Sequence, residues 1–151
     1  MAETMRANLR KAPSVVAQAE AADLSGPLRE ARETALSGVA HHLQPEKLLQ
    51  IWGPHFSAAE LHEWVVPERT LARRLAKHEA LTIPETDRAL RLARATTEAA
   101  RVFGNAAKAA RWLRKPNASL GGQTPLSLLR TETGAKAVEE SLTQIDHGIF
   151  A

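Results

Sequence analysis

Adjacent histidines and carboxylates occur at several points of the chain, and such pairs could bind a metal or transfer protons. His41 and His42 are neighbours, so on a helix their side chains would point about 100° apart. No carboxylate or third histidine follows them at ligand spacing. The pair His62-Glu63 lacks the second histidine of the H-E-x-x-H zinc motif, because position 66 is Val66. With no cysteine in the chain, the sequence predicts no metal site.

Catalytic groups also lack the partners that they need. Asp146 and His147 are adjacent on an expected helix and cannot form the hydrogen bond that orients a catalytic base. Glu139-Glu140 diverge in the same way. Gly121-Gly122 is not followed by the lysine and hydroxyl residue of a phosphate-binding loop. We expect neither an enzyme nor a bound cofactor.

Composition predicts an all-α fold. The 151 residues are 44% apolar but only 4% aromatic, so leucine, alanine, valine and isoleucine must build the core. Abundant alanine, leucine, arginine and glutamate with few β-branched runs favours helices. The absence of cysteine fits a reducing cytoplasm. No segment has the apolar length of a secretion signal or a membrane span, so we expect a cytoplasmic protein that does not enter membranes.

Positive charge is concentrated in the middle third of the chain. Residues 1–65 hold 6 basic and 8 acidic side chains, residues 66–116 hold 12 and 5, and residues 117–151 hold 2 and 4. A basic block of this kind commonly meets phosphate, although a solvated helical surface would show the same composition.

Residues 45–66 read as two helices and a turn. A helix is expected over 45–52, with Gly53-Pro54 ending it. Ser57 and Glu60 have the spacing of a capping box, which begins a short helix with Leu61 and Trp64 turned inward. A tight connection through Val65-Val66 follows.

A second helix is predicted over 67–77, with Leu71 and Leu75 facing the core. A short capped helix, a tight turn and a helix with outward arginines is the helix-turn-helix pattern of DNA-binding proteins. Arginine there suits contacts to guanine or phosphate. The residues predicted to bind DNA are Arg69, Thr70, Arg73, Arg74 and Lys77.

The longest helix is predicted over 81–103, begun by a second capping box at Thr82 and Glu85. One apolar face is expected, made of Leu90, Ala93, Thr97, Ala100 and Phe103. Its arginines, at 88, 91 and 94, are expected to face solvent or a partner. Before these elements, an arm over 1–26 is expected to be flexible, and a helix over 27–39 to pack or to mediate dimerisation.

The sequence of residues 102–150 predicts three helical segments, separated by residues that typically end or begin helices. Asn105 suits the N-cap of a helix over 106–114, which Pro116 must end. Gly121-Gly122 suits positive φ or a close backbone approach. Thr124-Pro125 suits an N-cap followed by a first helical residue. A last helix is expected from Thr133-Gly134, with an apolar face at Val138, Leu142 and Ile145 and a terminal glycine at Gly148.

Several short motifs in this region, in this order, resemble the toxin-binding domain of Xre/MbcA/ParS antitoxins. They are Arg111-Trp112-Leu113, Pro116-Asn117, Leu120-Gly121-Gly122, Thr124-Pro125 and the ending His147-Gly148-Ile149-Phe150. The resemblance covers about the last fifty residues closely and extends less tightly back to about Leu43. The run Pro67 to Arg74 is similar to the Xre-type helix-turn-helix of the same family.

The resemblance implies an antitoxin of a type II toxin-antitoxin system. Its partner would be a RES-domain toxin that consumes NAD, and a homodimer would bind promoter DNA to repress its own operon. The implied modules are the helix-turn-helix and dimerisation module at 27–100 and the toxin-binding module at 101–151, joined through the long helix. The residues expected to contact toxin are Trp112, Asn117, Leu120, Gly121, Gly122, Thr124, Arg130, Gly148, Ile149 and Phe150.

Two other functions fit the same residues. The chain could be a free-standing transcription regulator whose C-terminal module only assembles oligomers. It could also bind toxin without binding DNA, because related proteins usually have glycine in the turn where this chain has Val65. A β-branched residue is costly at positive φ, so the turn either takes another geometry or is strained.

Overall fold

The computed structural model describes residues 23–148, and every regular element in that range is a helix, which confirms the all-α prediction. The elements are α3 (Ser25–Leu36), α4 (Pro45–Lys47), η1 (Leu48–Trp52), α5 (Ala58–Trp64), α6 (Glu68–Lys77), α7 (Ile83–Phe103), α8 (Ala106–Arg114), η2 (Ala118–Leu120), α9 (Pro125–Leu128) and α10 (Glu132–Asp146). Most of the arm predicted at 1–26 lies outside the described residues. Helix α3 begins at Ser25 rather than at Pro27.

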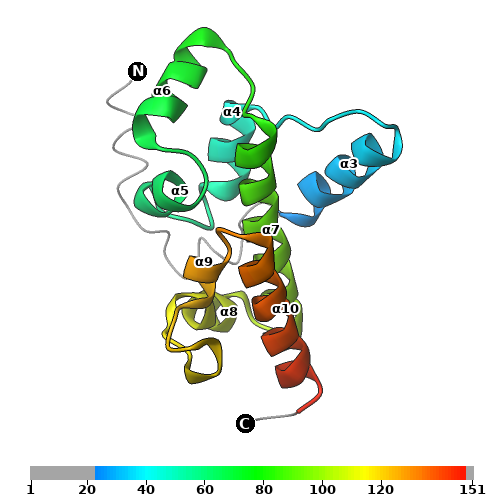
Figure 1. Cartoon of the computed structure of the whole chain (residues 1–151), viewed down its shortest axis with the longest axis vertical. Coiled ribbons are helices and arrows are strands. Elements are labelled where there is room, and N and C mark those ends of the chain that lie inside the picture. The colour runs from blue at the N-terminus through cyan, green and yellow to red at the C-terminus, as the bar shows by residue number, and fades with distance from the viewer. Residues whose placement is uncertain (1–22, 149–151) are drawn as a thin grey trace.

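Helix α7 is the spine on which the other helices pack (Figure 1). α10 lies alongside its lower half, and α3, α8 and η1 also contact it. Burial on α7 therefore extends beyond the single predicted face, and the fully buried apolar residues are Ala89, Leu92, Ala93, Ala95 and Ala99. Of the predicted face only Ala93 is among them, and the other four are half-buried. The prediction therefore misplaced the most buried face of α7, which neighbouring helices cover from several sides.

The segment predicted as one helix over 45–52 is a short α-helix that continues as the π-helix η1. Trp52 ends η1, is fully buried, and donates its indole N–H to the carbonyl oxygen of Ala89 at 2.8 Å. A satisfied indole inside the core ties this segment to α7. The backbone at Gly53 passes so close to Leu49 that an added Cβ would lie 2.2 Å from the Leu49 carbonyl oxygen.

Both predicted capping boxes are present. The Ser57 hydroxyl accepts the Glu60 backbone N–H, and the Glu60 carboxylate accepts the Ser57 N–H, which begins α5. Thr82 and Glu85 make the same reciprocal pair at the start of α7. Two otherwise unpaired helix N–H groups are thus satisfied at each start.

Val65 ends α5 with φ −118° and is 2% exposed, so the turn adopts a geometry without positive φ and without strain at this residue. The one non-glycine residue with positive φ between 23 and 148 is His78 (φ 53°), which ends α6. On α6, Leu71 is buried and Leu75 half-buried, as predicted.

The last helix begins at Glu132, one residue before the predicted Thr133-Gly134 start, because Thr131 is its N-cap and accepts the Gly134 N–H at 3.0 Å. A Cβ on Gly134 would lie 1.9 Å from the carbonyl oxygen of Leu128. Glycine thus allows α10 to start against the end of α9. Val138 and Leu142 are fully buried, as predicted for this helix. None of the helices within 23–148 is both long and apolar enough to cross a membrane.

Candidate functional site: a basic surface and a closed loop

The solvent-facing side of α6 carries cations that have no ion pair within 23–148. Arg69, Arg73 and Lys77 are spaced four residues apart, on the side of the helix opposite Leu71, and all three are exposed. Thr70 is half-buried at the edge of this surface. The arrangement can contact a polyanion without breaking any internal ion pair.

Arg74 departs from the prediction, because it does not face outward. Its guanidinium bonds the Glu85 carboxylate at 2.8 Å, lies 3.7 Å from Glu79, and leaves its side chain 12% exposed. Glu85 is also the residue that closes the second capping box. Arg74 thus holds α6 onto the start of α7, and the expectation that it joins the outward surface is wrong.

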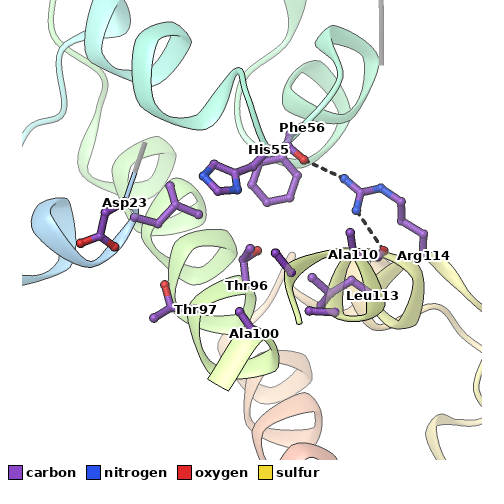
Figure 2. Close-up of a pocket in the computed structure, with 12 residues that line it drawn as sticks. Asp23, His55, Phe56, Thr96, Thr97, Ala100, Ala110, Leu113 and Arg114 are labelled. Atoms are coloured by element: carbon purple, nitrogen blue, oxygen red, sulfur yellow. Dashed lines mark hydrogen bonds between the residues drawn. The ribbon is translucent and has the colours of Figure 1, made fainter. Parts of the chain in front are cut away.

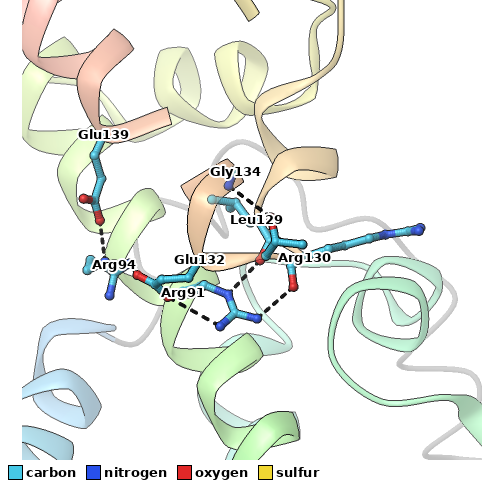
Figure 3. Close-up of polar contacts among 8 residues, drawn as sticks. Arg91, Arg94, Leu129, Arg130, Glu132, Gly134 and Glu139 are labelled. Atoms are coloured by element: carbon cyan, nitrogen blue, oxygen red, sulfur yellow. Dashed lines mark hydrogen bonds and ion pairs between the residues drawn. The ribbon is translucent and has the colours of Figure 1, made fainter. Parts of the chain in front are cut away.

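The arginines of α7 were expected to face solvent or a partner, and the structure contradicts this for Arg91, whose side chain is only 12% exposed, whereas Arg94 is exposed (Figure 3). Arg91 donates to the carbonyl oxygens of Leu129 and Arg130, each at 2.9 Å. Arg94 bonds Glu132 at 2.9 Å and Glu139 at 2.6 Å. Arg88, nearer the N-terminal end of the same helix, donates to the Val65 carbonyl oxygen at 2.9 Å. These residues bind α7 to the turn after α5 and to the α9–α10 corner.

The predicted loop after α8 is closed on itself. Asn117 donates its backbone N–H to Gln123 at 3.0 Å, and its carbonyl oxygen accepts the Gly122 N–H at 2.9 Å. The Asn117 side chain also accepts the Ser119 N–H and hydroxyl, at 2.9 and 2.7 Å. Gly121 and Gly122 have φ of 68° and 78°, which confirms the need for positive φ. Such a loop is ordered before any partner arrives.

Four further residues predicted to contact toxin have internal contacts. Trp112 packs its ring against Phe103, with centroids 5.8 Å apart. Leu120 is half-buried against the core, and Thr124 caps α9 by accepting the Ser127 N–H. Arg130 lies 4.4 Å over the Trp64 ring and bonds Glu63 at 3.1 Å, yet its side chain stays 55% exposed. These contacts fix the four side chains in place.

Gly148 follows the end of α10 with φ 70°, as expected for a glycine at this position. Ile149 and Phe150 lie outside the described residues.

A pocket of about 280 Å³ lies between the segment before α5 and helices α7 and α8 (Figure 2). Its wall is mainly apolar, with Phe56, Ala100 and Leu113 among the lining residues. The hydroxyl of Thr96 is buried there and has no hydrogen-bond partner among the residues that the structure describes. At the rim, Arg114 donates to the His55 carbonyl oxygen at 2.9 Å. Within 23–148 no three metal-ligating side chains come together, here or elsewhere.

Arg114 is the residue of this region that reading the sequence missed. Its guanidinium makes two bonds to the Glu60 carboxylate, at 2.9 and 3.0 Å, across 54 positions of chain. Glu60 was recognised only for its local role in the capping box. Nothing in the local pattern of α8 separates Arg114 from the exposed Arg111.

The shifted pKa values belong to residues that hold the fold. Hydrogen bonds from Arg101 lower the pKa of Glu98, and hydrogen bonds from Ser25 lower that of Asp23. Bonds to Glu98 and Asp146 raise the pKa of Arg101. Burial is the largest single influence on Arg94 and lowers its pKa, but Glu132 and Glu139 together outweigh it, so the net shift is upward.

Comparison with known proteins matches residues 98–148 to the antitoxin Xre/MbcA/ParS C-terminal toxin-binding domain. Antitoxin Xre of Pseudomonas putida KT2440 is 45% identical over 84 residues, which is 56% of this chain and 53% of the relative. Antitoxin Xre of Yersinia enterocolitica serotype O:8 is 34% identical over 104 residues, 68% of this chain and 70% of the relative.

A third relative, antitoxin Xre of Photorhabdus laumondii, is 38% identical over 84 residues and is covered over 57% of its length. The chain thus spans about half the length of two of these relatives and 70% of the Yersinia protein. Three observations indicate the same family. They are the order of helix-ending and helix-starting residues between α8 and α10, the domain match and the coverage of the Yersinia relative. The chain belongs to the Xre/MbcA/ParS family of antitoxins.

Proposed function

We propose that this protein is a non-enzymatic antitoxin of a type II system that binds a RES-domain toxin and blocks its degradation of NAD. The observation that carries the proposal is the match of residues 98–148 to a toxin-binding domain. The closed loop from Asn117 to Gln123 supports it, because an ordered loop loses little entropy on binding. Both partners would meet in the cytoplasm.

The blocking element in this proposal is the end of the chain. Gly148 follows the end of α10 and is exposed, and Ile149 and Phe150 come next in the sequence. Burying two such side chains in a toxin's NAD cleft would contribute about 1.5–3 kcal/mol each. Occlusion of this kind needs no catalytic group on the antitoxin.

The second part of the proposal is autoregulation of the operon through α5 and α6 as a helix-turn-helix. The exposed cations Arg69, Arg73 and Lys77 support it, because none has an ion pair among the described residues and phosphate contacts would therefore break none there. A homodimer would place two such helices on two half-sites of the promoter. Leu36 and Val39 support dimerisation through the α3 end, since they remain 78% and 59% exposed.

Co-expression with the neighbouring open reading frame tests the first part. The antitoxin should co-purify with that product, and cells should keep their NAD. A variant lacking residues 149–151 should still bind promoter DNA but should no longer protect the cells from loss of NAD. Equal protection of NAD by the truncated and full-length chains would rule out the tail as the blocking element.

The free-standing regulator remains the alternative, and the absence of both a complex and NAD loss would favour it.

A gel shift on the protein's own promoter tests the DNA part. Arg69→Ala and Arg73→Ala should each weaken binding and lower the slope of log affinity against log salt by about 1. Lys136→Ala, an exposed cation on α10, is the matched control. Equal shifts for all three variants would exclude α6 as the helix that contacts DNA, and no shift with the unaltered chain would leave a toxin binder without DNA binding.

A further inference from the structure

We propose that α8 and the residue after it present a second basic surface, made of Lys108, Arg111 and Lys115, that docks on an acidic surface of the toxin. The inference rests on the proposed function and adds the chemistry of the partner's surface.

The first observation is a long stretch of chain without acid. Between Glu98 and Glu132 there is no aspartate or glutamate, although the stretch includes α8, η2, the closed loop and α9. Its basic residues are Arg101, Lys108, Arg111, Arg114, Lys115 and Arg130. Any carboxylate that pairs with them must come from another part of the protein or from a partner.

Three of the six cations are neutralised by carboxylates outside the stretch. Arg101 bonds Glu98 and Asp146, Arg114 bonds Glu60, and Arg130 bonds Glu63. The fold thus supplies a carboxylate wherever one of these cations holds two segments together.

The other three cations have no carboxylate within 23–148. Lys108 and Arg111 lie one turn apart on α8, on the side opposite its buried residues Ala109 and Leu113, and Lys115 follows the helix end. All three are exposed. Lys108 and Arg111 thus share a solvent-facing side of α8, and Lys115 lies between the end of α8 and the closed loop that begins at Asn117.

Helix stability explains only part of this surface. Cations near the C-terminal end of a helix are favourable, which accounts for Arg111 and Lys115. Lys108 sits in the first turn, at the third helical position after the Asn105 cap, where a cation opposes the helix dipole. The same position holds Glu60 in α5 and Glu85 in α7. A lysine there weakens α8 slightly and adds to the exposed charge.

An acidic protein fits this surface better than DNA does. The three cations lie inside the segment that matches the toxin-binding domain, and Lys115 directly precedes the loop proposed to contact toxin. The cations suited to DNA are on α6, in the other half of the molecule (Figure 1). Charges at the rim of an interface mainly raise the association rate, and salt weakens that effect.

The test compares the full chain with Lys108→Glu/Arg111→Glu by measuring association rates with the purified product of the neighbouring open reading frame. Lys108→Glu places an acid at the third helical position of α8, which Glu60 occupies in α5 and Glu85 in α7. Helix α8 should therefore stay folded, and circular dichroism checks this. At low salt the double variant should associate at least about 10-fold more slowly, and the difference should shrink at high salt. Lys136→Glu, an exposed cation on α10, should change the rate much less.

Equal rates and equal salt dependence in the two chains would overturn the inference and leave the antitoxin proposal standing. Loss of promoter binding with unchanged toxin association would also overturn it, and would assign the surface to nucleic acid. Failure of the unaltered chain to bind the product at all would refute the proposed function and, with it, this inference.

Discussion

Arg114 on α8 binds Glu60 at the start of α5, and the Glu60 carboxylate has two functions. Glu60 accepts the Ser57 N–H at 3.0 Å to complete the cap of α5, and it accepts two bonds from the Arg114 guanidinium on α8. Arg114 also lies 5.7 Å from the centre of the Phe56 ring. The start of α5 is therefore fixed by the helix that leads to the proposed toxin-binding loop.

Arg114→Ala should lower the free energy of unfolding by about 2 kcal/mol, because charge-assisted hydrogen bonds and a cation–π contact are lost at a partly buried site. Urea denaturation measures the change. Arg111→Ala on the same helix is the control and should shift stability by less than about 0.5 kcal/mol. Similar effects for the two variants would show that the pair with Glu60 contributes little.

Gly134→Ala should cost about 2 kcal/mol, since the added Cβ would fall 1.9 Å from the Leu128 carbonyl oxygen and force α9 and α10 apart. Gly26→Ala is the matched control, because nothing lies within 4 Å of the Cβ that it would add on α3. The control should be neutral or stabilising by up to about 1 kcal/mol. Thermal unfolding of both variants distinguishes crowding from a general effect of losing glycine.

Glu98→Gln should change how stability depends on pH. Hydrogen bonds from Arg101 hold the pKa of Glu98 below its ordinary value of 4.5. The stabilising contribution is therefore complete above pH 4.5 and disappears as the pH falls through the lowered pKa. The unaltered chain should exceed Glu98→Gln in stability near neutral pH, by a small margin because the pair is exposed.

Denaturation at about pH 7 and at about pH 3 measures that margin, which should shrink in acid. Glu140→Gln, which removes an exposed carboxylate without a partner within 23–148, should show no such change. A margin that is equal at both pH values would mean that the pair with Arg101 does not stabilise the fold.

Lys108→Glu alone should raise stability by about 0.5 kcal/mol, because the acid would favour the N-terminal end of α8 and could complete a capping box with Asn105. Lys108→Ala should give a smaller gain. Differential scanning calorimetry compares the three chains. A loss of stability on Lys108→Glu would mean that the lysine has a structural role that its exposure does not reveal.

The sequence predicted best where a residue acts on its own backbone. Ser57 and Thr82 cap helices, Gly121 and Gly122 adopt positive φ, and the apolar spacing of α10 finds its buried face. Each of these effects depends on residues within one or two turns. Local rules were therefore enough to find them.

Prediction failed where a long side chain could reach a distant group. Arg74, Arg88 and Arg91 were expected outward, yet each binds an oxygen atom brought near by tertiary packing. The methylene groups of an arginine can lie along an apolar surface while its guanidinium binds a distant acceptor. Helical periodicity gives the direction of the Cβ atom but not the final position of the guanidinium. For the same reason Arg114 was missed, while Arg69 and Arg73 on α6 are exposed as predicted.

The shared helix α7 has a consequence for how such proteins can be recombined. The predicted module boundary between residues 100 and 101 falls inside α7, whose upper part bonds the turn after α5 through Arg88 and whose middle bonds the α9–α10 corner through Arg91. A cut at that boundary would expose apolar surface on both pieces. If the proposed toxin binding holds, exchange of toxin specificity between relatives would require a graft that carries α7 together with its arginines and the residues that accept their hydrogen bonds.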